Sequence, residues 1–168
     1  RETGPKLCQG CHADLMKEQA GGTGTKHPPF AKGDCLGCHD AHGSNARGML
    51  VTDQKSLCLK CHAGQGKAAA SARSVHSAFS SGDCSKCHSP HKAALKSLLL
   101  ASSPDLCLSC HAEMKTQMAS AKFVHKAVQE DCSNCHDPHA SNFAMQINKD
   151  PLALCSTCHE KVAKKATE

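Results

Sequence analysis

The sequence predicts a protein of mainly short α-helices and coil, with little or no sheet, built from internal repeats. No run of alternating apolar and polar residues marks a strand. Leu, Ile, Val and Phe supply only 24 of the 168 residues, and Trp and Tyr are absent. Such a chain has too few large apolar side chains for an ordinary hydrophobic core. A cysteine motif recurs seven times along the chain, so repeats are expected to organise the fold.

Three segments favour helix. Residues 110–128 contain helix-forming residues without Gly or Pro, so we expect a helix there. Residues 61–79 have a similar composition that favours helix less strongly. The short segment 11–20 ends at two glycines, which commonly stop a helix. Proline-containing turns are expected at 89–90, 137–138 and 150–151.

The recurring motif is Cys-x-x-Cys-His, and it uses every cysteine and seven of the 13 histidines. The cysteines are Cys8, Cys11, Cys35, Cys38, Cys58, Cys61, Cys84, Cys87, Cys107, Cys110, Cys132, Cys135, Cys155 and Cys158. The histidines that directly follow them are His12, His39, His62, His88, His111, His136 and His159.

Three interpretations of the cysteine pairs fit poorly. A redox dithiol needs one copy in a thioredoxin-like βαβ setting, and seven copies without strand patterning do not match it. Four-cysteine zinc sites use the pairs two at a time, which leaves one of seven over. Disulfides would suit an exported chain. Neither zinc nor disulfides explain a histidine after the second cysteine in every copy.

Covalent c-type haem explains the whole motif. Two thiols at this spacing can each form a thioether to one vinyl group of a porphyrin, and the adjacent imidazole ligates the iron from one face. The sequence therefore predicts seven covalently attached c-type haems, each with its iron. The haems would supply the missing core, so the chain should not fold without them.

The seven motifs fall into two classes. In the Leu class a leucine directly precedes the first cysteine, at Leu7, Leu57, Leu106 and Leu154. In the Asp class an aspartate precedes it, at Asp34, Asp83 and Asp131. Only the Asp class has an upstream histidine (His27, His76 and His125) and a downstream histidine three residues after the motif (His42, His91 and His139).

Spacing defines the repeats. From an Asp-class motif to the next Leu-class motif the first cysteines always lie 23 residues apart, at 35 to 58, 84 to 107 and 132 to 155. From a Leu-class motif to the next Asp-class motif the separation of the first cysteines varies, with values of 27, 26 and 25 residues (8 to 35, 58 to 84, 107 to 132). We predict one haem-cored domain, 1–168, with repeats 27–62, 76–111 and 125–159 after an extra haem segment at 1–26.

The doublet "HPPFAKGDCLGCHDAHGS…SLCLKCH" resembles the paired-CXXCH multihaem cytochromes, and the resemblance covers nearly the whole chain. It implies bis-histidine haems in a closely spaced chain and a role in respiratory electron transfer. Relatives of this kind include periplasmic carriers, conduits through outer-membrane porins and subunits of extracellular cytochrome filaments. The resemblance does not choose among them, and it leaves a homo-oligomer or filament open.

The six extra histidines are candidate distal ligands, because low-spin haem iron needs a second axial ligand. We name each haem by its first cysteine. A helical turn would put His42 and His39 on one side, so His42 should reach another haem. The simplest assignment gives His42, His91 and His139 to the Cys58, Cys107 and Cys155 haems. It gives His27, His76 and His125 to the Cys35, Cys84 and Cys132 haems. A reach from His42 back to the Cys8 haem remains the alternative.

One haem is left over, because seven irons have 14 axial positions and the chain has 13 histidines. The Cys8 haem precedes the repeats and has no upstream histidine, so we expect its sixth position to lack a histidine of this chain. The rival candidate is the Cys155 haem. Packing against porphyrin is the expected role of the five methionines and of Phe30 and Phe79.

These features predict an electron carrier and not an enzyme, acting with other redox proteins or extracellular electron acceptors. The alternative is a haem reductase of a small oxyanion, acting at the haem without a distal histidine. The side-chain charge of +5 is offset by fourteen haem propionates, and the chain lacks a basic stripe and stacking aromatics, so nucleic acid is not an expected partner.

The longest apolar run, 98–101, is too short for a transmembrane segment. Haem attachment to thiols belongs outside the cytoplasm, so we expect a periplasmic or extracellular protein whose signal peptide has been removed.

Overall fold

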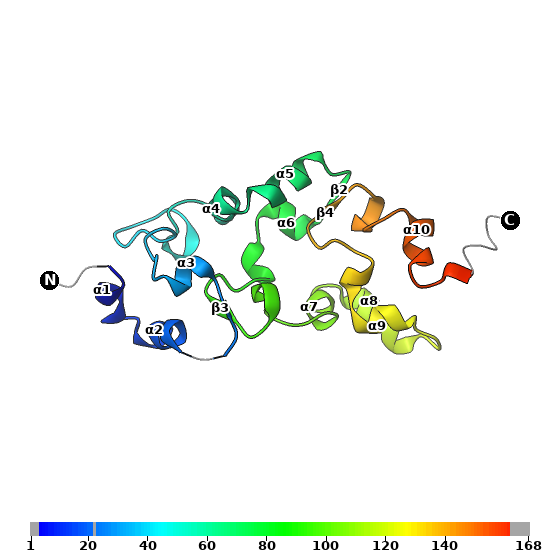
Figure 1. The fold of residues 1–168 in the computed structure, drawn as a ribbon, viewed down its shortest axis with the longest axis horizontal. Coiled ribbons are helices and arrows are strands. Elements are labelled where there is room, and N and C mark those ends of the chain that lie inside the picture. Colours follow the sequence, from blue (N-terminus) through cyan, green and yellow to red (C-terminus); the bar gives the residue numbers. More distant parts are fainter. Residues whose placement is uncertain (1–3, 22, 162–168) are drawn as a thin grey trace. The chain divides into compact units, whose positions relative to one another are not determined.

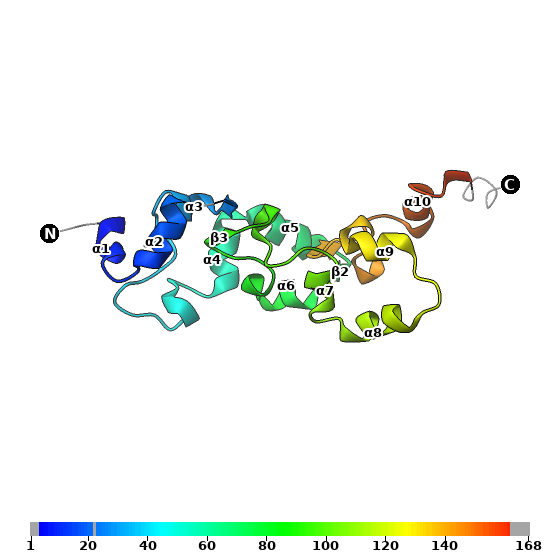
Figure 2. The same cartoon turned by 90° about the horizontal axis from the view of Figure 1, so that it is seen from below.

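The structure is a computed structural model that describes residues 4–21 and 23–161. Short helices joined by coil make up most of it, which confirms the predicted fold class (Figures 1 and 2). The α-helices are α1 Pro5–Gln9, α2 Ala13–Ala20, α3 Pro28–Ala31, α4 Gln54–Cys61, α5 Ala63–Ser71, α6 Ser77–Ser81, α7 Asp105–Leu108, α8 Ala112–Ser120, α9 Lys126–Glu130 and α10 Pro151–Ser156. Short 3₁₀ turns are η1 Arg47–Met49, η2 Cys84–Lys86, η3 Lys96–Leu98, η4 Cys132–Asn134 and η5 Ala144–Gln146.

Two predicted helices are divided in the structure. The segment 110–128 forms α8 and α9, because the chain becomes extended at Ala121 (ψ 134°) and again at His125 (ψ 125°). The segment 61–79 likewise contains α5, a short strand and α6. The interruption in 61–79 contains β2, which pairs with residues far along the chain, and helix-forming composition does not reveal such pairing. The expected helix 11–20 is present as α2 and ends at Gly21.

Four two-residue strands form two antiparallel ribbons. The strands are β1 Thr25–Lys26, β2 Ser74–Val75, β3 Lys92–Ala93 and β4 Ala140–Ser141. β1 pairs with β3, and β2 pairs with β4, which lie side by side in Figure 1. Each ribbon joins the segment before an upstream histidine to the segment after the downstream histidine of the next repeat. Consecutive repeats are therefore interlocked through their backbones.

The chain forms two compact units, and each contains two separate stretches of sequence. The first unit comprises Arg1–Cys61 and Gly82–Ser102, and the second comprises His62–Ser81 and Ser103–Glu168. The unit boundaries differ from those of the sequence repeats, because each ribbon brings part of one repeat onto the next. The single haem-cored domain remains a prediction.

Very little of the described chain is buried. Within residues 4–21 and 23–161, Met16 and Phe30 are the buried hydrophobic side chains, with exposed fractions of 6% and 9%. Leu7, Leu36 and other large apolar side chains are exposed, as expected of a polypeptide that surrounds large prosthetic groups. None of the described helices has the length and apolar character needed to cross a membrane.

Candidate haem sites

Each cysteine motif is wound into a single helical turn. In the first motif the backbone N–H of His12 donates to the Cys8 carbonyl at 2.9 Å, and five further motifs have the same bond at 2.9–3.0 Å. Residues three apart in such a turn lie on one side. The two thiols and the following imidazole are thus brought together at one site, as attachment to a porphyrin and ligation of its iron require. None of the 14 cysteines forms a disulfide.

Thiols of consecutive motifs lie next to one another. Burial raises the pKa of Cys58 to about 11, and the neighbouring Cys84 thiol contributes through charge and a hydrogen bond. Equivalent thiol pairs raise the pKa of Cys35 beside Cys8 and of Cys107 beside Cys132, again after burial as the main cause. These pairs place successive haem-attachment sites next to one another within each unit. Once attached as thioethers, the sulfurs would no longer titrate.

The Asp-class histidines are held in one tautomer. The Nδ1 atoms of His39, His88 and His136 lie 2.8 Å from the carbonyl oxygens of Gly48, Ser97 and Met145 respectively. A ring N–H that donates to a backbone carbonyl puts the lone pair on the other nitrogen, Nε2, which is the atom that would ligate a metal. This support is typical of metal-ligating histidine, so the side chains fit a haem iron.

The carbonyls that support these histidines belong to a strained turn further along the chain. Two consecutive residues in each repeat have left-handed backbone, with φ between 54° and 73°: Gly48 and Met49, Ser97 and Leu98, and Met145 and Gln146. The turn is joined to the motif by backbone hydrogen bonds such as the one from the Asp40 N–H to the Met49 carbonyl, at 2.8 Å. Left-handed backbone is costly for residues other than Gly. Only Gly48 signals it in the sequence, so sequence reasoning missed this element.

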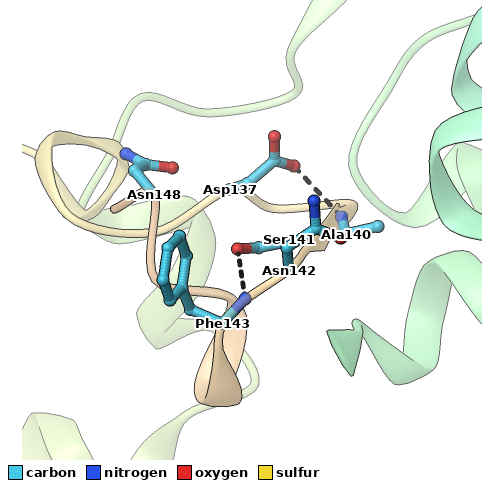
Figure 3. A pocket seen from close by; sticks show the side chains of 6 residues that line it. All are labelled: Asp137, Ala140, Ser141, Asn142, Phe143 and Asn148. Atoms are coloured by element: carbon cyan, nitrogen blue, oxygen red, sulfur yellow. Dashed lines mark hydrogen bonds between the residues drawn. The ribbon is translucent and has the colours of Figure 1, made fainter. Parts of the chain in front are cut away.

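Side-chain caps position the downstream histidines. Asp137 accepts hydrogen bonds from the backbone N–H groups of His139 (2.8 Å) and Ala140 (3.1 Å). Asp137 and Ala140 also line a hollow of about 190 Å³, and Figure 3 shows the bond between them. Asp40 makes the equivalent bonds to His42 and Gly43, and these bonds hold its pKa below the usual value. The segment from histidine to histidine is therefore a capped turn, and the helical turn expected for His39 and His42 is wrong.

The aspartates before the cysteines stabilise the motif turn. Asp34 accepts from the Gly37 N–H at 3.1 Å, and Asp131 accepts from the Ser133 N–H at 2.9 Å. The bond from Ser133 is the main reason that the pKa of Asp131 is lowered. Asp83 instead forms an ion pair with Lys86 at 2.7 Å. Capping of the motif turn was one of the two roles that the sequence left open for these residues.

Three pairs of histidine rings lie at the spacing of axial ligands. The ring centroids of His39 and His91 are 6.0 Å apart, those of His76 and His111 are 6.1 Å apart, and those of His125 and His159 are 5.8 Å apart. Two imidazoles on one metal would have centroids about 6 Å apart, given metal–nitrogen bonds of about 2.0 Å and ring bonds of about 1.3 Å. Each pair joins a histidine of a cysteine motif to one extra histidine.

These pairs correct the expected distal ligands. His91 was assigned to the Cys107 haem, but it lies beside His39, the proximal histidine of the Cys35 haem in the preceding repeat. His76 was assigned to the Cys84 haem but lies beside His111. His125, assigned to the Cys132 haem, lies beside His159 of the Cys155 motif. For His91 the assignment failed because the β1–β3 ribbon brings it onto the preceding repeat. His76 and His125 instead reach the Leu-class motif of their own repeat.

Comparison with known proteins agrees with this geometry. The family model described as the doubled CXXCH motif matches residues 27–67, 76–116 and 125–164. The chain belongs to this family of multihaem c-type cytochromes. The three matches begin at His27, His76 and His125, where the repeats identified by spacing also begin. A search of curated proteins finds no match. Membership in the family indicates covalently bound haem and a role in electron transfer.

Phenylalanines of the cytochrome pack on the downstream histidines. The rings of Phe30 and His91 have centroids 5.0 Å apart, and those of Phe79 and His139 are 5.1 Å apart. Burial, followed by the nearby His39, lowers the pKa of His91. A lowered pKa favours the neutral imidazole, which is the form that ligates metal. Phe30 and Phe79 thus hold a histidine of the next repeat, a contact that the sequence did not reveal.

Three motif or downstream histidines have different surroundings. In the part of the chain that the structure describes, His12, His42 and His136 make no ring contact with another histidine. His12 is the N-terminal flanking residue of α2, and Met16, four residues later, is buried on that helix. The expected lack of a distal histidine at the Cys8 haem stays a prediction.

Proposed function

We propose that this cytochrome carries seven covalent haems and passes electrons between neighbouring haems. The observation that carries the proposal is the set of adjacent thiol pairs within each compact unit, which puts neighbouring attachment sites within contact of each other. Cys8 adjoins Cys35, Cys58 adjoins Cys84 and Cys107 adjoins Cys132. Cys38 and Cys61 are also close enough to interact, which supports continuity from the Cys35 site to the Cys58 site.

The chain's own residues have separable tasks in this function. Haem supplies one-electron exchange at iron when it is bound. The cysteines would fix the position of each group, and the paired histidines, whose rings lie near 6 Å apart, would hold its iron. The carbonyls of Gly48, Ser97 and Met145 hold the histidine tautomer. An iron with two histidines has no open position for substrate, so it suits electron exchange.

The spacing of the histidines supports a repeated arrangement of the haem sites. An upstream histidine precedes its Leu-class partner by 35 residues in His76 and His111 and by 34 in His125 and His159. His27 precedes His62 by 35 residues. The downstream His91 follows His39 by 52 residues, and His139 follows His88 by 51. The intervals between histidines are thus nearly constant from one repeat to the next.

The cytochrome is proposed to act in the periplasm or outside the cell, where haem is attached to thiols. Its partners are other redox proteins or extracellular electron acceptors, and its assembly is a soluble carrier, a porin-bound conduit or a filament. Electron microscopy of the purified holoprotein would distinguish a filament from the two other assemblies. The second candidate function, reduction of a small oxyanion, is favoured only by the lack of a histidine beside His12.

Counting haems tests the proposal directly. A pyridine haemochrome assay combined with intact mass should give seven haems for each chain, and redox titration should follow seven one-electron centres. A colourless protein with zinc in place of haem would overturn it. Rapid turnover of nitrogen or sulfur oxyanions by the holoprotein would favour the reductase.

A further inference from the structure

We propose that the left-handed turns give the haems at Asp-class motifs lower reduction potentials than the haems at Leu-class motifs. The carbonyls of Gly48, Ser97 and Met145 are then positioning groups that act on the iron through the motif histidine. This inference rests on the proposed haem attachment and deepens it, because it names the sites of the chain at which an electron is held.

Three hydrogen bonds hold each Asp-class motif against its turn. In the second repeat the Nδ1 atom of His88 lies 2.8 Å from the Ser97 carbonyl oxygen. The Ser89 N–H donates to a carbonyl of the turn at 2.8 Å, and the Leu100 N–H donates to a carbonyl of the motif at 3.0 Å. The first and third repeats have the same three bonds. Backbone pairing therefore keeps the carbonyl beside the ring.

Among the described residues, the Leu-class histidines have no such turn beside the ring. His12, His62 and His111 instead directly precede helices α2, α5 and α8, with φ between −108° and −88°. The ring nitrogens of His12, His111 and His159 form no hydrogen bond with a residue that the structure describes. The two classes therefore differ in the support of the ligating ring.

The turn carbonyl increases electron donation by the ligand. An Nδ1–H group that donates a hydrogen bond makes the ligating Nε2 atom a stronger base. A stronger base stabilises ferric iron more than ferrous iron, because the ferric ion carries the greater positive charge. Hydrogen bonding around the axial ligand is one of the means by which a protein sets the potential of a haem. The Asp-class sites should therefore be harder to reduce.

The aspartate of the Asp-class motif acts in the same direction. Asp34, Asp83 and Asp131 precede the first cysteine where the Leu class has an apolar leucine, and a carboxylate at the attachment site also favours the ferric state. Asp34 and Asp131 accept from backbone N–H groups of the motif at 3.1 and 2.9 Å. Asp83 has a weaker effect, because it forms an ion pair with Lys86 at 2.7 Å.

Burial alone would give the opposite order. His39 and His88 are half-buried, whereas the four Leu-class motif histidines are exposed. Poorer solvation disfavours the extra charge of the ferric state, which would raise the potential of the Asp-class sites. The hydrogen bond should outweigh this effect, because none of the seven motif histidines is buried and solvation differs little between the classes. The measured order therefore distinguishes the two causes.

Neighbouring attachment sites would have unlike potentials. Each adjacent thiol pair joins a Leu-class cysteine to an Asp-class one: Cys8 to Cys35, Cys58 to Cys84 and Cys107 to Cys132. Each transfer moves one electron between two irons, and no other reactant is needed. In a partly reduced chain the electrons should therefore be held at the Leu-class member of each pair.

Redox titration of the intact holoprotein, resolved for each haem, tests this order. Nuclear magnetic resonance follows the haem methyl signals through successive stages of oxidation, and each signal is assigned through the cysteines of its own motif. The Cys35 haem should be oxidised before the Cys107 and Cys155 haems. These three are comparable, because the motif histidine of each has a second histidine ring at 6.0, 6.1 and 5.8 Å respectively. Oxidation of either Leu-class haem first, or at the same potential, would overturn the inference.

Two substitutions at one turn test its role. Ser97→Val puts a β-branched residue at φ 57°, which strongly disfavours the turn and should weaken the bond to His88. The reduction equilibrium constant of the Cys84 haem should then rise about tenfold, or about 59 mV for a one-electron couple. Ser97→Gly also removes the hydroxyl but readily adopts the left-handed backbone, so it should leave that potential unchanged.

Ser120→Val is the matched control in a Leu-class segment. Ser120 follows His111 by nine residues, the interval from His88 to Ser97, but it ends helix α8, and its substitution should leave the Cys107 haem unchanged. The inference is overturned if this haem shifts as far as the Cys84 haem does. It is also overturned if Ser97→Val keeps the potential while nitrogen-15 resonance shows a weakened Nδ1 bond.

Haem content is measured first for every variant. If Ser97→Val loses a haem or retains the Nδ1 bond, the order of potentials in the wild-type chain decides alone. A wild-type chain with fewer than seven haems would instead contradict the proposed function.

Discussion

His91 and His42 occupy the same position in two repeats but have different surroundings. The His91 ring lies between Phe30 and His39, and its backbone carbonyl accepts from the His27 N–H at 2.9 Å. His42 shares an aspartate-capped turn with His139, but among the described residues no strand follows it and no phenylalanine ring lies against it. The turn thus forms in both repeats, whereas the packing of the His91 ring depends on residues of the preceding repeat.

Haem removal should abolish this difference and has the largest expected effect. With two buried hydrophobic side chains among the described residues, the polypeptide cannot offset its chain entropy by burial alone. Chain produced without haem attachment should give a disordered circular dichroism spectrum with no cooperative melt. A cooperative melt of the haem-free chain would show that the polypeptide holds the two regions without its prosthetic groups.

Phe30→Ala should be the most destabilising single substitution near His91. It removes a buried ring that packs on the histidine, and loss of a buried phenylalanine costs about 3 kcal/mol of unfolding free energy. Phe123→Ala is the matched control, since that ring is 85% exposed and its loss should cost less than about 0.5 kcal/mol. Denaturant unfolding of the holoproteins measures both. Equal losses would mean that Phe30 does not support the histidine.

Two glycines give a backbone version of the same comparison. Gly24 precedes β1 with φ +109°, and an added Cβ would lie 2.5 Å from the Ala93 carbonyl oxygen of the facing strand. Gly24→Ala should therefore cost about 1–3 kcal/mol and add a ligand-accessible haem by displacing His91. An added Cβ at Gly43 would meet nothing within 4 Å, so Gly43→Ala should be nearly neutral. Thermal melts and carbon monoxide titration would reveal the contrast, and a destabilised Gly43→Ala protein would contradict it.

The smallest predicted effect concerns the capped turn at Asp40. Hydrogen bonds from His42 and Gly43 lower the pKa of Asp40 in the folded chain. The stabilisation is therefore complete above the pKa of the unfolded chain, near 3.8, and is lost as the pH falls through the lower folded pKa. Asp40→Asn should keep an acceptor and show a weaker loss of stability below pH 3.8. Asp40→Ala should weaken the turn at every pH, and identical acid unfolding curves for all three proteins would refute the prediction.

The cysteine motifs and the repeat boundaries could be recognised from the sequence because they rest on local spacing. The match of the family model begins at the same three histidines. Distal pairing could not be recognised in this way, since His91 reaches His39 across 52 residues through a ribbon of two-residue strands. Strands as short as Lys92–Ala93 carry no periodic signal. The left-handed Ser97 and Met145 were equally hidden, because neither is a residue type that favours that backbone.

The ribbons also affect how such a protein can change in length. His27, His76 and His125 follow one another at intervals of 49 residues, and each junction between repeats uses the same pairing of an upstream segment with a downstream one. A duplication or deletion of one whole interval inside the array would join compatible edges and return every internal histidine to an iron. Unequal recombination could therefore lengthen or shorten the array of repeats without a single new side chain.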